Sequence, residues 1–300
     1  MNKKVVCIVV TYNRLPLLKE CIAAISEQSY PVHTILVVNN NSSDGTTEYL
    51  QTLSDDAIQV LNLAENMGGA GGFYAGIKAA YTKTDCEYYW MMDDDTIPES
   101  DCLEELMKSE EALHGNFGFL ASQPIWIDGN PNLMNIPRPS KVWNRMVSKD
   151  LIQVECATFV SVLLNKVAVE RVGLPYKEFF IWSDDIEYTM RIDDVMPGYF
   201  VGKSKAVHKT KNNVGSDIVT DSADRVSRYF YAYRNYFYTQ KKYLGFEGIA
   251  KQIAKLFVMI FQILAKSKGQ KSKRIGTISR GLICGLFFHP KVEYLHSKEV

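Results

Sequence analysis

Short apolar runs alternate with segments of helical spacing through the first hundred residues, and this alternation restricts the fold more than any other feature. An apolar run at 5–10 precedes helical spacing at 15–28, which precedes a β-rich run at 34–38. Apolar runs of about four to eight residues are typical of buried strands. The alternation continues at 46–53, 58–63, 72–83 and 88–92. It predicts an α/β fold in which helices cover a parallel sheet and ligands bind at the carboxyl ends of the strands.

A different pattern begins after residue 100. The predicted elements are a helix over 101–113, strands over 117–127 and 154–164, an irregular loop over 128–149, and helices over 229–243 and 249–265. We therefore expect an α/β domain over residues 1–222 and a basic α-helical region over residues 223–300.

Charge and cysteine usage exclude several classes of protein. The chain has 34 basic and 34 acidic residues, but residues 251–300 contain ten Lys or Arg and two Glu. The remainder is therefore net acidic and lacks a nucleic-acid motif, which argues against a nucleic-acid partner. The six cysteines form no CxxC pair, so we expect reduced thiols and a cytoplasmic protein. No stretch reaches the ~18 apolar residues of a membrane span, so we expect none.

Three carboxylates, Asp93, Asp94 and Asp95, directly follow the apolar run 89–92. Crowded carboxylates repel one another, and a divalent cation such as Mn²⁺ or Mg²⁺ relieves that repulsion while also binding a diphosphate. An acidic surface turn is the alternative. The position at a strand end favours the metal site.

Two polar segments follow other predicted strands. The segment 66–73, with the sequence NMGGAGGF, places four glycines before a helix, where bare amides suit phosphates or sugars. It matches neither GxGxxG nor the Walker pattern, so a flexible turn is an equal alternative. The segment 39–46 contains Asn39 and Asn40, which could touch a base, and residues such as Ser43 and Asp44 that cap helices.

Together with TYNR at residues 11–14, these segments resemble glycosyltransferase family 2, whose members have the GT-A fold. The resemblance covers about residues 5–210, and NMGGAGGF combined with WMMDDD is similar to the subgroup of galactofuranosyl- and rhamnosyltransferases. It implies a metal-dependent, inverting transfer of galactofuranose or rhamnose from a UDP- or dTDP-linked donor to a hydroxyl of a cell-surface polysaccharide precursor.

The resemblance also implies a set of donor-binding residues. Asn39 stands where the family usually has an Asp that binds uracil or thymine, and an amide can donate as well as accept. The implied donor site contains Thr11, Tyr12, Asn13, Arg14, Asn39, Asn40, Asn66, Gly68, Gly69, Gly72, Asp93 and Asp94.

A second acidic segment, FFIWSDDIEY at residues 179–188, is similar to the family's acceptor site. By that resemblance Asp185 is the general base, with Asp184 as second choice, and Trp182 and Glu187 contact the acceptor. A base must lie within hydrogen-bonding reach of the acceptor hydroxyl. The alternative is that both aspartates only cap the helix that follows.

The resemblance places His208 on the family's metal-binding histidine, so the implied metal ligands are Asp93, Asp95 and His208. The alternative is a structural histidine, which is the commoner case for a lone His near a strand.

The basic tail permits two interpretations. Its helical apolar spacing, flanked by lysines, suits either an anionic membrane surface or packing against the first domain or a second subunit. A membrane contact would fit a lipid-linked glycan acceptor at the inner face of the plasma membrane. The apolar residues concerned are Ile253, Leu256, Phe257, Ile260, Phe261 and Leu264.

Two other functions remain open at the level of sequence. A sugar-nucleotide nucleotidyltransferase also combines an α/β domain with carboxylate-bound magnesium, but it needs a basic loop where this chain has TYNRLP. A non-catalytic glycan- or nucleotide-binding module of the same fold would not require acidic residues at both 93–95 and 184–187.

Overall fold

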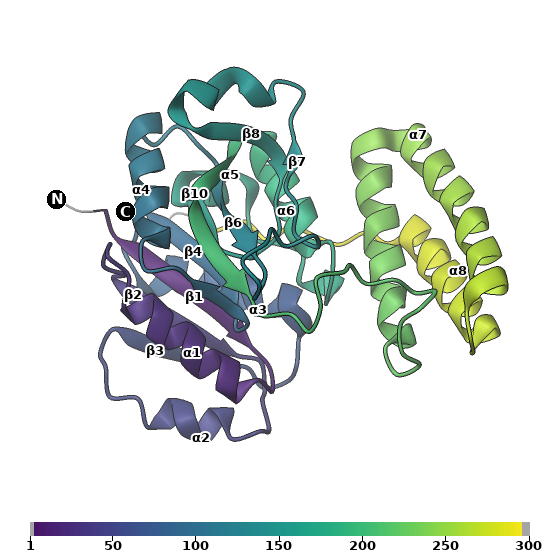
Figure 1. Cartoon of the computed structure of the whole chain (residues 1–300), viewed down its shortest axis with the longest axis horizontal. Coiled ribbons are helices and arrows are strands. Elements are labelled where there is room, and N and C mark those ends of the chain that lie inside the picture. The colour runs from purple at the N-terminus through teal and green to yellow at the C-terminus, as the bar shows by residue number, and fades with distance from the viewer. Residues whose placement is uncertain (1–2, 296–300) are drawn as a thin grey trace. The chain divides into compact units, whose positions relative to one another are not determined.

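The computed structural model describes residues 3–295 and divides them into two compact units (Figure 1). Residues 3–177, 185–213 and 292–295 form one unit, here called the sheet unit. Residues 178–184 and 214–291 form the other, here called the helical unit. The division differs from the expected boundary at residue 222, because the chain enters the helical unit earlier and its end returns to the sheet unit.

The sheet unit contains one ten-stranded sheet of order β3-β2-β1-β4-β9-β6-β10-β8-β7, with β5 paired to β10. Its strands are β1 Val5–Thr11, β2 Thr34–Asn39, β3 Ile58–Asn62, β4 Tyr88–Asp93, β5 Thr96–Pro98, β6 Phe119–Ile125, β7 Arg138–Pro139, β8 Leu151–Cys156, β9 Val162–Asn165 and β10 Gly198–His208. Its α-helices are α1 Leu15–Ser26, α2 Thr46–Gln51, α3 Gly68–Lys83, α4 Cys102–Leu113, α5 Lys166–Val172 and α6 Asp184–Asp193, with a 3₁₀-helix, η1, at Trp143–Lys149.

The α/β prediction is confirmed, and the sheet is mixed. Strands β3, β2, β1 and β4 run parallel, as does the pair β6 and β10. The other pairs are antiparallel, including those that join β9 to β4 and β6. The predicted strand over 154–164 is two strands, β8 and β9, separated by the segment 157–161, which lies in the candidate site described below.

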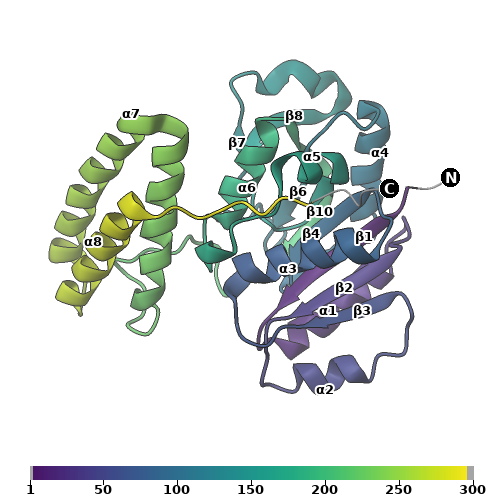
Figure 2. The ribbon, with the colours of Figure 1, turned by 180° about the vertical axis from the view of Figure 1, so that it is seen from behind.

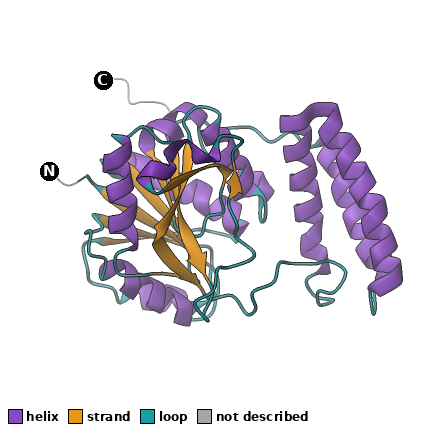
Figure 3. Cartoon of the chain, turned by 45° about the horizontal axis from the view of Figure 1, so that its top comes forward, coloured by secondary structure: helices purple, strands orange, loops and turns teal. Residues whose placement is uncertain are grey.

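Helices cover both faces of the sheet because alternate side chains of a strand point to opposite faces. Val6, Ile8 and Val10 of β1 belong to a core cluster that also contains residues of α3, α5 and α6. Figure 2 shows α3 lying over this face of the sheet. Val5, Cys7 and Val9 pack with α1, α2 and α4 on the other face. Figure 3 shows the strands enclosed between helices. A strand buried on both faces is apolar throughout, which is why β1 forms a continuous run in the sequence.

Glycines allow α3 to approach β1 closely. A Cβ at Gly72 would lie 2.5 Å from Cγ1 of Val10, and a Cβ at Gly76 would lie 2.5 Å from Cγ2 of Ile8. The helix begins at Gly68, so the glycines predicted to form a turn occupy its first turns. Gly72 therefore serves packing between helix and strand, whereas a Cβ at Gly69 would meet no atom within 4 Å.

This difference makes a matched pair of variants. We expect Gly72→Ala to lower the free energy of unfolding by about 1 to 3 kcal/mol, because the added methyl overpacks the contact with Val10. Gly69→Ala should leave stability unchanged or slightly raised, since alanine favours helix. Urea unfolding of both variants checks this. Equal stability of the two would contradict the packing role of Gly72.

The helical unit contains α7 Tyr229–Lys266 and α8 Lys271–Phe287, preceded by a 3₁₀-helix at Val226–Arg228. Helix α7 is kinked at Gly245, whose φ of 55° and ψ of −132° break the helical geometry. The kink lies between the two helices predicted from sequence. Gly281 and Gly285 of α8 allow close contact with the first half of α7, since a Cβ at either would lie within 2.8 Å of a backbone oxygen there.

The stretch Val226–Lys266 is long and apolar enough to cross a membrane by length and composition, although no span was expected from the sequence. Only 17% of the most apolar 18-residue window in this stretch is buried. The difference from expectation arises because isolated lysines interrupt the apolar run without shortening the helix.

Candidate active site

Asp94 organises the turn that follows β1. Its carboxylate accepts hydrogen bonds from the Thr11 hydroxyl at 2.8 Å and the Tyr12 backbone N–H at 3.3 Å, and it pairs with Arg14 at 3.2 Å. Burial raises the pKa of Asp94 to about 6, and the nearby Arg14 guanidinium opposes that shift. Parallel pairing of β1 with β4 brings Asp94 to this turn. The structure therefore gives Asp94 a positioning role, which was not expected from the sequence.

Asn39 stabilises the turn after β2 through hydrogen bonds of its side chain. Asn39 donates to Thr47 at 2.9 Å and to Asn62 at 2.8 Å, so both of its amide hydrogens are used, and its side chain accepts from the Ser42 N–H. Asn39 is also 1% exposed. The base contact expected of Asn39 is therefore not supported by this arrangement.

Asn40 and Asn66 stabilise the start of α3. The Asn40 side chain accepts from the Met67 N–H at 2.8 Å and donates to the Gly68 carbonyl at 2.9 Å. Asn66 accepts from the Gly68 N–H at 2.8 Å. These contacts fix the amino end of α3 beside the carboxyl ends of β1 and β2, where an anion would meet the positive end of the helix dipole.

Asn13 joins the turn after β1 to the turn after β2. It has a left-handed φ of 53°, and its side chain accepts from the Ser43 N–H at 2.7 Å. The neighbouring Tyr12 side chain is 44% exposed. Tyr12 is therefore available for stacking on a ligand.

Sheet register brings Asp95 next to His208, although the two are 113 positions apart in the chain. Thr96 of β5 pairs directly with His208 at the end of β10, and the Lys209 N–H donates to the Asp95 carbonyl at 2.8 Å. Nε2 of His208 then lies 3.3 Å from Oδ1 of Asp95. The other carboxylate oxygen of Asp95 pairs with Arg14.

Asn135 orients His208, and the sequence had not suggested this residue. Its Oδ1 lies 2.9 Å from Nδ1 of His208, while the amide of Asn132 is further from the same nitrogen, at 3.5 Å. The Asn135 amide group donates to the Thr158 hydroxyl at 2.9 Å, which turns Oδ1 toward the histidine. The shorter contact places an imidazole hydrogen on Nδ1, and in the neutral imidazole this leaves the lone pair of Nε2 facing Asp95.

This arrangement fits a divalent cation. Oδ1 of Asp95 is buried and has no hydrogen-bond donor. With a neutral His208 the nitrogen and the carboxylate oxygen can share a cation, whereas a doubly protonated His208 forms an ion pair with Asp95 instead. Within residues 3–295 no group of three or more His, Cys, Asp or Glu side chains has a metal-binding arrangement. Asp95 and His208 therefore offer two protein ligands, and the half-buried Asp93 ends β4 two residues before Asp95.

Asp185 lies in the first turn of α6. Its carboxylate accepts from the Ile186 N–H at 2.7 Å, and burial raises its pKa to about 6, although backbone hydrogen bonds that include Phe159 oppose the shift. Thr189 anchors α6 by exchanging hydrogen bonds with the backbone of Ala157, each of 3.1 Å. The pKa of this carboxyl group is thus close to neutral pH, which suits a group that accepts a proton at physiological pH.

The segment 157–161 connects the two acidic groups. The backbone of Phe159 reaches Asp185, and the hydroxyl of the preceding Thr158 holds Asn135, which orients His208 beside Asp95. The Phe159 ring packs on Phe73 of α3 at 4.7 Å between centroids. A chain of contacts through this segment therefore links Asp95 to Asp185.

The residues that precede Asp185 belong to the helical unit and have a strained backbone. Phe180, Trp182 and Ser183 all have φ between 65° and 66°, which is costly for residues other than glycine. Asn235 of α7 stabilises this conformation by donating to three carbonyls, those of Phe179, Ile181 and Trp182, at 2.9 to 3.1 Å. The Trp182 ring packs on Tyr229 at 5.2 Å, and Asp184 is buried.

Glu187 does not support the acceptor role expected of it. It is 1% exposed and forms a two-point ion pair with Arg191, at 2.9 and 3.2 Å. Arg191 also donates to the carbonyls of Val172 and Leu174. Glu187 therefore belongs to the interior that fixes α6 against the loop after α5, because its one-turn spacing from Arg191 turns both side chains inward.

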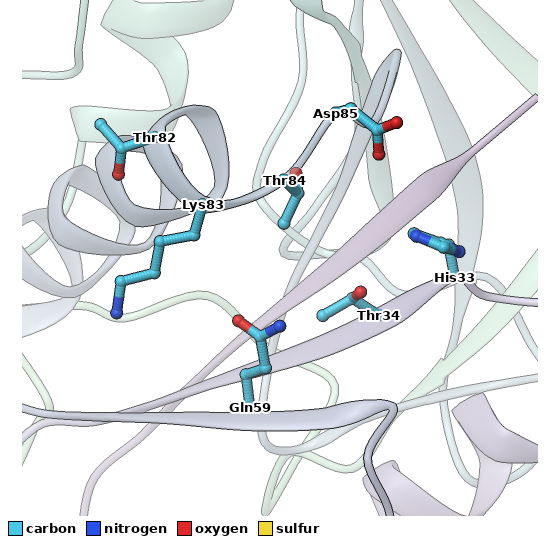
Figure 4. A pocket seen from close by; sticks show the side chains of 7 residues that line it. All are labelled: His33, Thr34, Gln59, Thr82, Lys83, Thr84 and Asp85. Carbon is cyan, nitrogen blue, oxygen red and sulfur yellow. The ribbon is translucent and has the colours of Figure 1, made fainter.

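A hollow of about 410 Å³ lies at the opposite edge of the sheet (Figure 4). Thr34 begins β2, and Thr84 and Asp85 precede β4, so this hollow adjoins the amino ends of the strands. Ligands of open α/β sheets bind at the carboxyl ends. The candidate site is therefore the region of Asp94, Asp95, His208 and Asp185.

Comparisons with known proteins agree with this geometry. The family model described as Glycosyl transferase family 2 matches residues 6–158. Galactofuranosyltransferase GlfT1 of Mycolicibacterium smegmatis is 27% identical over 254 residues, which cover 78% of this chain and 82% of that protein. Galactofuranosyltransferase GlfT1 of Mycobacterium tuberculosis is 25% identical over 201 residues, which cover 64% of this chain and 65% of that protein.

The fold has a solved counterpart. The crystal structure of S. aureus TarS 1-349 superimposes with a TM-score of 0.55 at 14% identity, covering 95% of this chain and 72% of that chain. At that identity the likeness concerns the fold alone. The match to the family model, by contrast, extends over half of the sequence. The chain is a sugar-transferring enzyme of the GT-A fold and belongs to glycosyltransferase family 2.

Proposed function

We propose that this enzyme moves galactofuranose from a UDP-linked donor to a hydroxyl of a cell-surface polysaccharide precursor, with inversion at the anomeric carbon. Two relatives named galactofuranosyltransferase support the sugar, and rhamnose from a dTDP-linked donor is the second candidate. The network from Asp95 through His208, Asn135 and the segment 157–161 to Asp185 carries the proposal, because it joins a group for the donor phosphates to a base for the acceptor.

Asp185 acts as the base in this proposal. Its carboxylate removes the proton of the acceptor hydroxyl while the oxygen forms a bond to the anomeric carbon. The bond between that carbon and the nucleoside diphosphate breaks on the opposite face, which inverts the configuration. A carboxyl with a pKa of about 6 is mostly ionised at neutral pH yet still accepts a proton. Asp184 is the second candidate for the base.

The remaining residues of the turns bind the donor. The exposed Tyr12 and Asn13 lie against the nucleotide, whereas the buried Thr11 positions Asp94. The amino end of α3 at Gly68 and Gly69 faces the donor phosphates. Trp182 contacts the acceptor sugar. Asp95 and His208, with Asp93, would hold Mn²⁺ or Mg²⁺, and such a cation would offset negative charge on the leaving diphosphate.

Product analysis tests the reaction. Purified enzyme with Mn²⁺ and a short glycan acceptor should convert UDP-galactofuranose to a glycosylated product and UDP. The product should carry the inverted anomeric configuration by NMR. A product from dTDP-rhamnose alone would reassign the sugar. Release of pyrophosphate from a nucleoside triphosphate and a sugar phosphate would indicate a nucleotidyltransferase, and donor binding with neither product would indicate a non-catalytic module.

Asn135 supplies a prediction that does not depend on turnover. Asn135→Leu removes the acceptor that orients His208, so we expect Mn²⁺ binding in the presence of UDP to weaken by about 10- to 100-fold. Isothermal titration with Mn²⁺ measures the change. Asn130→Leu is the matched control, because Asn130 is exposed in the same loop. Equal Mn²⁺ affinity of the two variants would contradict the orienting role.

We place the enzyme in the cytoplasm at the inner face of the plasma membrane, where a lipid-linked glycan acceptor would be presented. The basic composition of the tail supports this location.

A further inference from the structure

The second half of α7, residues 246–266, exposes a continuous apolar face. We use that name for Phe246, Ile253, Phe257, Phe261 and Leu264, which are spaced by seven, four, four and three residues and therefore share one side of the helix. Phe246 is 84% exposed, Phe261 72% and Phe257 66%. Soluble proteins seldom expose several large apolar side chains side by side, so this face is suited to a partner.

The opposite side of the same helix is already packed. Gly248, Gln252 and Ile263 are buried, and Ile263 belongs to a cluster with Ile218, Val219 and Ile278 of the helical unit. Tertiary packing therefore fixes the rotation of α7 and directs the apolar face away from the core of this unit. The apolar face is therefore distinct from the side of α7 that packs in the core of the helical unit.

Charge selects the class of partner. Lys251, Lys255 and Lys266 are exposed and lie between the apolar face and the buried side of the helix, and only Lys251 has an acidic neighbour on the helix, Glu247 at 2.6 Å. Residues 214–291 contain 14 Lys and Arg against 4 Asp and Glu. From residue 248 to 291 there are nine basic and no acidic residues. Such a surface attracts an anionic partner and repels a second copy of itself.

Two further observations favour a surface position over a membrane span. Lys251 and Lys255 lie within the apolar stretch of α7, where a bilayer core would exclude their charges. Helix α8, which packs with α7, carries Lys271, Lys273, Arg274 and Arg280. A helix with one apolar side and basic residues beside it lies in the membrane interface, with its aromatic side chains among the acyl chains and its lysines at the lipid phosphates.

We propose that the apolar face of α7, with its flanking lysines, docks the enzyme on the anionic surface of a phospholipid bilayer. The docking deepens the proposed function, because it would hold the active site near a lipid-linked acceptor. It is measured without donor or acceptor, so its failure would leave the transfer reaction untouched.

Co-sedimentation of the full chain with vesicles tests the docking. Vesicles of phosphatidylcholine containing phosphatidylglycerol should bind the protein, and vesicles of phosphatidylcholine alone should bind it much more weakly. Lys251→Glu with Lys255→Glu should lower the partition coefficient by about 25-fold or more, at roughly fivefold for each lysine near the surface. Phe257→Ser with Phe261→Ser should lower it by about 100-fold or more.

Matched controls separate docking from unfolding. Trp143→Ser alters a 48% exposed aromatic side chain of the sheet unit and should bind vesicles like the unaltered chain. All variants should keep the unaltered melting temperature and transfer sugar to a short soluble acceptor at the unaltered rate. Equal binding to both kinds of vesicle, or unchanged binding by the Phe257 and Phe261 variant, would overturn the proposal. Dimerisation through this face without lipid, or resistance to extraction at alkaline pH, would replace it with a protein interface or a span.

Discussion

We expect Asp185→Asn to remove most sugar transfer and to raise the melting temperature of the enzyme at about pH 7.5. We expect the rate to fall by about 10² to 10⁴, the range associated with a positioned general base. The amide keeps the size of the carboxyl group and can accept the Ile186 N–H, so the fold is retained. Initial rates with a short acceptor, together with thermal unfolding, measure both effects.

The gain in stability follows from the raised pKa. Burial raises the pKa of Asp185 from 3.8 to about 6, so the folded enzyme binds the proton more tightly than the unfolded chain does. Such a group favours folding fully below about pH 4, and that contribution is lost as the pH rises through 6. Asparagine is neutral at every pH, so above pH 6 the variant gains about 1 to 3 kcal/mol. The gain should disappear near pH 4.

Asp193→Asn is the matched control on the same helix. Burial also raises the pKa of Asp193 to about 6, while its carboxylate accepts from the Gly198 N–H. This variant should gain stability with the same dependence on pH and keep the unaltered rate of transfer. Loss of activity in both variants would attribute the effect of Asp185→Asn to packing of α6. Full activity of Asp185→Asn would transfer the role of base to Asp184.

We expect Asp95→Asn to remove the proposed effect of Mn²⁺ on donor binding and to lower the rate of transfer by about 10³, which equals roughly 4 kcal/mol of transition-state stabilisation. The neutral amide is a poor ligand for a hard cation. In addition, its N–H group can donate to Nε2 of His208, 3.3 Å from the present oxygen, and so close the site. Titration with UDP, with and without Mn²⁺, measures the loss separately from turnover.

Asp85→Asn serves as the control for this experiment. Asp85 is an exposed carboxylate paired with Lys4 at the opposite edge of the sheet. UDP binding by that variant should retain its full dependence on Mn²⁺. If UDP binding by Asp95→Asn also retained that dependence, the cation would have to bind elsewhere, and Asp95 would be left with its pairing to Arg14 as a structural role.

The sequence by itself determined the helix and strand pattern of the first hundred residues. Strands β1, β2 and β4 are buried on both faces, and strands of this kind consist of unbroken apolar runs. Their predicted limits therefore differ from the observed limits by only one residue. The acidic residues 93–95 and 184–185 were predicted as site residues for a similar reason, since clustered carboxylates are conspicuous at the ends of apolar segments. Family membership followed from the same local motifs.

Only the tertiary structure showed which of these side chains are committed to partners inside the protein. Asn39, Asp94 and Glu187 were predicted to bind a substrate because of their residue type and position. Each of these side chains instead forms hydrogen bonds or an ion pair with another residue of the protein. Conversely, Asn135 and Asn235 lie in segments without a motif and act through contacts with residues 73 and at least 53 positions away.

The return of residues 292–295 to the sheet unit was equally hidden, since it depends on the Glu293 backbone accepting from the Leu174 N–H at 2.8 Å. The physical reason is that periodicity and helix capping depend only on residues close together in the sequence. Hydrogen-bond partners across a sheet register or between helices are set by packing of the whole chain.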